Sequence, residues 1–500
     1  MVRSGLAFVG MLAFATIAAC TTGQIGDAES GNANALSPPL VPVSATDAGV
    51  TPSDVPTFAA DVEPIVQKSC QNCHRPGGIA PFSLVTYEDV MSHGHEAKLK
   101  TAARQMPPWG AFDNPDCKLT HPLKDDLRLT DDEISIIARW VDGGMPLGDA
   151  SKRPAPRTTF PATSIPGSTA YKLAKPYTVN PGPDDIRCFP VDPGIGKDTW
   201  ISATNVKPGD PRVVHHVIVY LDNNKSAVAK AGADGSYKCF GGPSLGDGVR
   251  PQLLLAWAPG VPPTGLAQTG AAIRIPANAG LVMQVHYHPI GETVTDQSSF
   301  EVLSMPEGAK PDYVAQVMLP GNARDAEGSN TDHIVKLLPG VDDPPSGPAF
   351  LIPSNAKAHK EEMEITAPPI TGLADIRIAM AGAHMHWAGV NMTLKTERAN
   401  PDEGQPKDEC LMSTPKYDFN WQRGYAYDEP FEKLPRINVG DKLRLTCTYD
   451  NTIANKNVQK AMYEENKKDP FELHLGETTH DEMCLSALVI VRKFVPGVDD

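Results

Sequence analysis

Basic residues are scarce in this sequence of 500 residues, where 45 lysines and arginines stand against 60 aspartates and glutamates. The resulting net charge of −15 argues against nucleic acids and anionic membrane surfaces as partners. Beyond the first twenty residues no apolar run is long enough to span a bilayer. Helical periodicity is also sparse after about residue 168, while 48 prolines and 42 glycines separate short apolar runs. The length allows roughly three domains, and this composition favours loop-rich β domains.

The first twenty residues have the pattern of an export signal. Arg3 precedes an apolar stretch at 6–17, and two alanines lead into Cys20. This pattern resembles the lipobox of bacterial lipoproteins, which implies a signal peptide at 1–19 and a lipidated Cys20. Ordinary signal cleavage and a short membrane anchor are the alternatives. Because Thr21 follows rather than aspartate, the resemblance implies an outer-membrane anchor that faces the periplasm or the cell surface.

Export sets expectations for the nine cysteines and for the next segment. Cysteines of an exported chain are expected to be oxidised, lipidated or bound to a cofactor. Residues 20–55 are mostly small or polar with hardly an aromatic, which predicts a disordered tether. A region at 56–150 follows, and a proline-rich linker at 151–170 ends it.

Two helices are expected within 56–150. The first begins near Asp61, so that Pro64 falls in its first turn. It leads into Cys70, Cys73 and His74, a C-x-x-C-H motif. The second begins at the capping box 130–133 and ends at two glycines, 143 and 144.

The C-x-x-C-H spacing is typical of covalent haem attachment, because two thiols can bond the haem vinyl groups while His74 binds iron. A zinc knuckle would need further ligands at set spacing, and a redox disulfide would need a surrounding βαβ pattern. Neither is visible. Met106 lies in a run that resembles the methionine loop of c-type cytochromes and is the expected sixth ligand, with Met145 as the weaker candidate. Residues 56–150 are therefore predicted to be a small all-α cytochrome c domain with one haem c.

The rest of the chain reads as β structure. Runs rich in β-branched residues occur at 213–220, 253–257, 281–288, 376–384, 443–449 and 485–492. Proline and glycine between them predict antiparallel β-sandwiches. Several of these runs contain or border histidine or methionine: His215, His216, His286, His288, His384, His386 and Met483. Imidazole with a thioether suits copper.

The geometry of a strand constrains these ligands. Adjacent residues face opposite sides, so His215 and His216 can share a metal only if the backbone bulges or twists there. His384 and His386 would share one face. For each of these histidines taken singly, a structural role in the fold is the alternative to metal binding. The histidines at 333, 359, 474 and 480 lie in polar stretches and are expected at the surface.

In their order along the chain, these motifs resemble the copper type II monooxygenases, the family of peptidylglycine α-hydroxylating monooxygenase and dopamine β-monooxygenase. The resemblance covers about residues 175–497 and rests on the segments 214–217, 256–259 with 262–263, 284–287, 384–386 and 481–484. It implies two antiparallel β-sandwich (jelly-roll) domains, at 171–318 and 319–500.

The resemblance also implies roles for single residues. His215, His216 and His286 would bind an electron-supplying copper. His384, His386 and Met483 would bind the copper at which O2 reacts. The implied disulfides are Cys188–Cys239 and Cys447–Cys484, whereas Cys117 and Cys410 either pair with each other or stay free. His288 matches no ligand of the family, which leaves it a supporting or structural role.

Departures from the family bear on the substrate. Gly382 stands where peptide-acting members have an arginine, and Leu485 and Ala487 stand where they have asparagine and tyrosine. Peptide amidation is therefore not expected. These departures leave room for a less polar substrate, which the sequence does not identify. We expect a monooxygenase with two copper ions that hydroxylates a C–H bond of a small organic molecule with O2. Electrons would arrive through the fused haem domain, from an ascorbate-like reductant or a redox protein. The alternatives are a non-catalytic electron-transfer or copper-binding lipoprotein, and a surface binding protein without metal.

Overall fold

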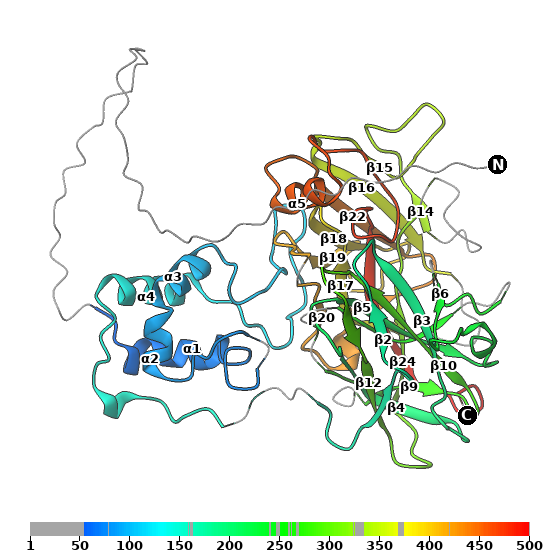
Figure 1. The fold of residues 1–500 in the computed structure, drawn as a ribbon, viewed down its shortest axis with the longest axis horizontal. Helices are drawn as coiled ribbons and strands as arrows, with labels where there is room; N and C mark the ends of the chain where they lie inside the picture. Colours follow the sequence, from blue (N-terminus) through cyan, green and yellow to red (C-terminus); the bar gives the residue numbers. More distant parts are fainter. Residues whose placement is uncertain are drawn as a thin grey trace, which may run out of the picture. The chain divides into compact units, whose positions relative to one another are not determined.

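The structure, a computed structural model, describes residues 55–499 except 79, 159, 161–163, 240–241, 247–250, 259–260, 262, 267–269, 324, 326–334, 369–374 and 420 (Figure 1). The chain divides into units at 1–54 and 55–500, and all described residues belong to the second. The predicted signal peptide, Cys20, nearly all of the tether and His333 lie outside the described residues. Among the described residues, no helix is long and apolar enough to cross a membrane.

Helices dominate the first part of the described chain. They are η2 (Phe58–Val62), α1 (Glu63–Ser69), α2 (Tyr87–Ser92), α3 (Gly94–Ala102) and α4 (Asp131–Asp142). Both expected helices are present. Pro64 lies in the first turn of α1, and the reciprocal hydrogen bonds of Thr130 and Glu133 cap α4. A small core of their own holds these helices together, centred on Phe58 and Trp140.

The remainder is mostly β-sheet, as predicted. Its first strands are β1 (Thr169–Lys172), β2 (Tyr177–Val179), β3 (Asp185–Val191), β4 (Thr199–Lys207), β5 (Val214–Asp222), β6 (Tyr237–Lys238), β7 (Gln252–Trp257), β8 (Thr264–Gly265), β9 (Ala271–Ile275), β10 (Gly280–Tyr287), β11 (Val294–Asp296), β12 (Ser299–Ser304) and β13 (Tyr313–Met318). The second half contributes β14 (Val335–Leu337), β15 (Leu351–Ile352), β16 (Lys357–Thr366), β17 (Ile376–His384), β18 (Gly389–Glu397), β19 (Asp408–Ser413), β20 (Gly424–Ala426), β21 (Arg436–Ile437), β22 (Lys442–Asp450), β23 (Leu473–His474) and β24 (Leu485–Lys493), with one helix, α5 (Lys456–Glu464). Short 3-10 turns are η3 (Ala150–Lys152), η4 (Val228–Lys230) and η6 (Phe431–Lys433). All six predicted strand runs are confirmed, as β5, β7, β10, β17, β22 and β24.

Strand pairing continues across the predicted boundary between residues 318 and 319. The largest sheet has the order β1-β12-β4-β9-β13-β7-β5-β10-β3-β6, and β24 joins it through β13 while also pairing with β17. A second sheet has the order β14-β16-β22-β18-β19. Because β13 pairs antiparallel with β24, strands from the two halves lie side by side. One hydrophobic cluster runs through both halves, from Leu173 to Val491, so the strands that carry the histidine motifs share a single core.

A segment between the helices also belongs to this β region. Cys117 forms a disulfide with Cys410, which settles the pairing that the sequence left open. The Phe112 N–H donates to the Ser413 carbonyl at 3.1 Å, and Trp109 is buried in the large hydrophobic cluster. This part of the range 56–150 is therefore attached to β19 and its neighbours.

The other two disulfides are those that the resemblance implied. Cys188 pairs with Cys239, and Cys447 pairs with Cys484. The first joins β3 to the chain just after β6. The second joins β22 to the residue that precedes β24. Both therefore lie near strands that carry candidate ligands.

Candidate metal centre

The adjacent histidines of β5 lie at a β-bulge. On the partner strand β10, His286 pairs with His216, but the next residue, Tyr287, pairs with Val214, so His215 is the extra residue. A bulge lets two consecutive side chains turn to the same side. The ring centroids of His215 and His216 are 4.1 Å apart, and that of His286 is 5.1 Å from His215. The interruption that a shared metal would require at these two residues is therefore present in β5.

Hydrogen bonds leave one ring nitrogen free on two of these three histidines, His216 and His286. His286 donates from Nε2 to Asp184 Oδ2 at 3.0 Å, and His216 donates from Nε2 to Gln422 Oε1 at 3.2 Å. The Nδ1 of His215 is buried and has no hydrogen-bond partner among the described residues. Since the partner of one nitrogen decides which nitrogen is open to a metal, Nδ1 is the open atom on His216 and His286. One nitrogen from each of the three rings lies within 4.8 Å of the others, a spacing that suits a single metal ion.

The second histidine pair has the opposite open nitrogen. His384 ends β17 and donates from Nδ1 to Gln422 Oε1 at 2.5 Å. His386 lies just beyond the strand and donates from Nδ1 to the Asp481 carbonyl at 3.0 Å. Nε2 is therefore open on both rings, whose centroids are 5.3 Å apart.

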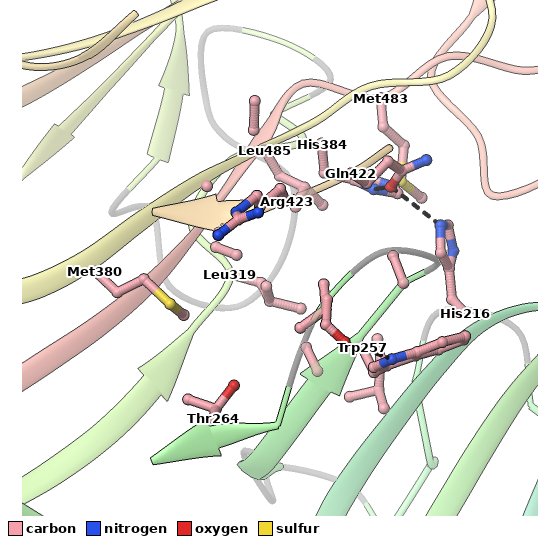
Figure 2. A pocket seen from close by; sticks show the side chains of 18 of the residues that line it. His216, Trp257, Thr264, Leu319, Met380, His384, Gln422, Arg423, Met483 and Leu485 are labelled. Carbon is pink, nitrogen blue, oxygen red and sulfur yellow. Dashed lines mark hydrogen bonds between the residues drawn. The ribbon is translucent and has the colours of Figure 1, made fainter. Parts of the chain in front are cut away.

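Met483 is held beside this pair by a buried carboxylate. Glu482 is fully buried, and its oxygens accept the backbone N–H groups of His386 at 2.8 Å, Ala388 at 2.6 Å and Met483 at 3.2 Å. The Tyr449 hydroxyl donates to the Met483 carbonyl at 2.8 Å. Figure 2 shows Met483 and His384 close to Gln422 in one cavity, which Met483, His384 and His386 all line.

The two ligand sets lie against each other. The ring centroids of His216 and His384 are only 4.8 Å apart. Both rings share the carbonyl oxygen of Gln422, whose bond to His216 is drawn in Figure 2. The Gln422 amide nitrogen donates to the Phe419 carbonyl at 3.1 Å, which fixes the oxygen towards the histidines. One glutamine thus orients a histidine from each set.

Burial favours the neutral form, which is the form that binds metal ions, on His215, His216, His384 and His386. Burial lowers the pKa of His384 to about 4 and that of His386 to about 3. The pKa values of His215 and His216 are also lowered by burial and then by neighbouring imidazoles. For Asp184, burial alone would raise the pKa, but hydrogen bonds from His286 and His288 hold it below its usual range. Neutral nitrogens with a thioether, and no carboxylate ligand among them, fit copper better than a hard cation.

A cavity of about 490 Å³ opens beside these ligands. It falls within the range of roughly 300–1,000 Å³ that is usual for small-molecule sites. His216 and His384 lie on its wall, and Trp257, Leu319, Met380 and Leu485 supply much of the remaining surface (Figure 2). The candidate metal ligands therefore face a largely apolar space.

Three further residues show where the sequence prediction held and where it did not. His288 donates from Nδ1 to Asp184 Oδ1 at 2.7 Å and so shares the carboxylate that orients His286. Met385, between the two histidines, is fully buried in the core. The expectation that His359 lies at the surface was wrong: only 8% of it is exposed, because Asp342 and Glu361 bind its two ring nitrogens.

Asp184, Gln422 and Glu482 were missed because each stands outside any periodic pattern. Asp184 precedes β3, and Gln422 lies between β19 and β20. Their roles arise only when segments distant in the sequence meet. Glu482 stands in the motif 481–484, but nothing in that motif reveals that its carboxylate binds three backbone N–H groups.

The cysteines of the C-x-x-C-H motif are free and half-buried. Burial raises the pKa of the Cys70 thiol to about 12. His74 donates from Nδ1 to the Phe82 carbonyl at 3.3 Å, which leaves Nε2 open. Met145 packs against the helical core, as does Cys70, whereas Met106 is half-buried and outside that core. Free thiols beside a histidine with an open nitrogen fit covalent haem attachment.

Comparison with known proteins adds little to this geometry. No protein-family model and no curated protein matches the sequence. Among solved structures, the chain is similar to the major capsid protein P2 from bacteriophage PM2, with a TM-score of 0.22 and 10% identity over 66% of this chain and 99% of that one. It is also similar to PNGase F, a glycosylasparaginase from Flavobacterium meningosepticum, with a TM-score of 0.23 and 12% identity over 65% of this chain and 96% of that one. Scores this low carry no conclusion about this chain.

Proposed function

We propose that the chain is a copper-dependent monooxygenase that hydroxylates a C–H bond of a small organic substrate with O2. One observation carries the proposal: five imidazoles, two buried and three half-buried, gather beside a thioether at one wall of a largely apolar cavity. On four of these rings a hydrogen bond to a protein oxygen occupies the other nitrogen. Copper held by these groups would supply the redox chemistry, with O2 at the set of His384, His386 and Met483.

The protein's own part in this reaction is positioning and exclusion of water. Asp184 and Gln422 keep the protons on the outer nitrogens, so the open nitrogens stay fixed in place. The thioether of Met483 is a soft ligand and favours Cu(I). The apolar wall excludes water and holds a substrate next to His384. A protein that only stored copper or passed electrons would need none of this cavity.

We further propose that residues 56–150 include a c-type cytochrome domain. Cys70 and Cys73 would attach the haem, His74 would be one axial ligand and Met106 the other. Haem in this place would supply one-electron transfer. The external donor would be an ascorbate-like reductant or a redox protein. Lipidation of Cys20 would hold the exported protein at the outer membrane, and three disulfides are in keeping with export.

The test is the metal content and Cu(I) affinity of the mature protein, with Met483→Ala and Met380→Ala as a matched pair. Both methionines line the same cavity, but only Met483 stands among the candidate ligands. We expect two coppers and one iron per chain. We also expect the sulfur signal in Cu(I) X-ray absorption to disappear in Met483→Ala alone. A fully haem-loaded protein without tightly bound copper would refute the monooxygenase and leave an electron-transfer lipoprotein.

A further inference from the structure

A half-buried cationic side chain lines the cavity and belongs to none of the ligand motifs. Arg423 directly precedes β20, the strand that pairs with β17 beside His384. Within that pairing Gly424 lies opposite Gly382, two residues before His384. Figure 2 shows Arg423 among the cavity residues, near Leu319, Met380 and Leu485.

The close approach of β20 explains why residue 382 is a glycine. A Cβ on Gly382 would lie 3.1 Å from the Gly424 Cα and 3.3 Å from the Arg423 carbonyl oxygen. Both neighbours are backbone atoms, which cannot move away as the end of a flexible side chain can. A side chain at position 382 is therefore disfavoured. The strand that approaches Gly382 is preceded by Arg423, which lies on the same wall of the cavity.

Arg423 lacks a counterion. Its guanidinium stacks over the buried Trp109 ring at 4.7 Å, and no carboxylate of the described residues forms an ion pair with it. Asp125 lines the cavity and interacts with it only through space. The Arg423 Nε is buried without a hydrogen-bond partner. Burial lowers the pKa of Arg423, because removing a cation from water is costly and Asp125 and Asp126 offset that cost only through space.

We propose that the cavity binds a small organic carboxylate, with the acid on Arg423 and an apolar body against Trp257, Leu319 and Met380. A planar guanidinium forms paired, charge-assisted hydrogen bonds with a carboxylate, a geometry that lysine cannot reproduce. As a statement about substrate class, this inference rests on the proposed function. It also bears on the substrate suggested by Gly382, Leu485 and Ala487, because Arg423 provides a charged group in a site where those residues pointed to a less polar molecule.

A carboxylate could come from a second source. The Cys73 thiol interacts electrostatically with Arg423, so a haem propionate would offer the same chemistry as a substrate acid. The test therefore needs one arm that reports on binding in the cavity and another that reports on the haem.

The binding arm uses phenylalkanoic acids from phenylacetate to 6-phenylhexanoate, each paired with its neutral amide. Calorimetry on the full-length holoprotein measures their affinity, with and without copper. We expect acids to bind more tightly than amides, and Arg423→Gln to weaken acid binding by about 10- to 100-fold without affecting amides. Arg423→Lys should recover part of the loss. Arg444→Gln removes an equal charge from a partly exposed ion pair with Glu364 and should change nothing.

The haem arm measures the midpoint potential of the same variants. A shift in potential for Arg423→Gln with unchanged acid binding would assign the arginine to a propionate and overturn the proposal. Equal binding of acids and amides, or no binding across the series, would overturn it too. Acid binding that depends on Arg423 in a protein without copper would uphold the carboxylate site while refuting the monooxygenase. Copper binding without acid binding would refute the carboxylate site and leave the monooxygenase proposal standing.

Discussion

Replacing Asp184 should lower both the free energy of unfolding of the protein and the copper affinity of the set that contains His286. The Asp184 carboxylate is 8% exposed and accepts three hydrogen bonds. Two come from the rings of His286 and His288, and the third is the Thr479 backbone N–H at 2.7 Å. Thr479 belongs to the second half of the chain, so this carboxylate also joins the two halves.

The size of the effect follows from the bonds that each variant keeps. Asp184→Asn retains one acceptor oxygen for His286 and Thr479 but loses the charge. Hydrogen bonds to a charged group contribute about 1.5–3 kcal/mol, against about 0.5–1.5 kcal/mol for neutral ones, so a loss of about 1–3 kcal/mol is expected. Asp184→Ala leaves two buried donors without partners and should cost about 3–6 kcal/mol. Loss of the group that orients His286 should lower copper affinity by about 10- to 100-fold.

Denaturant unfolding of the copper-free protein and competition with a Cu(I) chelator measure the two effects separately. Asp185→Asn is the matched control, because its side chain is 24% exposed and binds Arg187 and Tyr177 but no histidine. It should unfold at a slightly lower denaturant concentration and keep its copper affinity. Equal copper affinity in Asp184→Asn and the wild type would refute the assigned role of the carboxylate.

Two further predictions concern His121 and Gln422. Burial alone would lower the pKa of His121, but Glu409 and Glu429 bind its two nitrogens and raise it above the usual value. Its stabilising contribution should therefore be complete below about pH 6.5 and be lost as the pH rises through the raised pKa. Unfolding free energies at pH 5.5 and 9 should differ less in His121→Gln than in the wild type, and equal differences would contradict the assignment. Gln422→Leu removes the carbonyl shared by the two histidine sets and should lower the affinity for both coppers by about 10-fold or more. Chelator titration that shows one copper unaffected would show that the glutamine serves a single site.

Local pattern was enough to predict six of the 24 β strands in the described part of the chain. The six runs of β-branched residues became strands because alternation and turn residues act over a few positions. The bulge at His215 followed from the same rule, since two adjacent histidines can face one side only if the strand is interrupted. The capping box of α4 was equally local. None of these features depends on a distant segment.

The groups that orient the ligands could not be predicted in this way. Gln422 lies more than two hundred residues from His216 in sequence, and Asp184 lies 102 residues before His286. His359 sits in a polar stretch and yet is buried, because two acidic residues satisfy its ring. Gly382 suggested a missing arginine, whereas the segment just before β20 brings Arg423 to the same wall. In each case tertiary packing brings the decisive partner into place, and the periodicity of the sequence does not reveal it.

The contact between the two histidine sets gives the fold a specific consequence. His216 comes from β5 and His384 from β17, and each donates to the same Gln422 oxygen. That oxygen can serve both rings only when each presents its N–H, so the open nitrogens on the two sides are fixed together. Thr479 binds Asp184 in a comparable way, so the loop before Met483 is attached to the carboxylate that orients His286. The set of His215, His216 and His286 therefore depends on Gln422 from the second half of the chain, and the loop before Met483 is attached in turn to Asp184 from the first half.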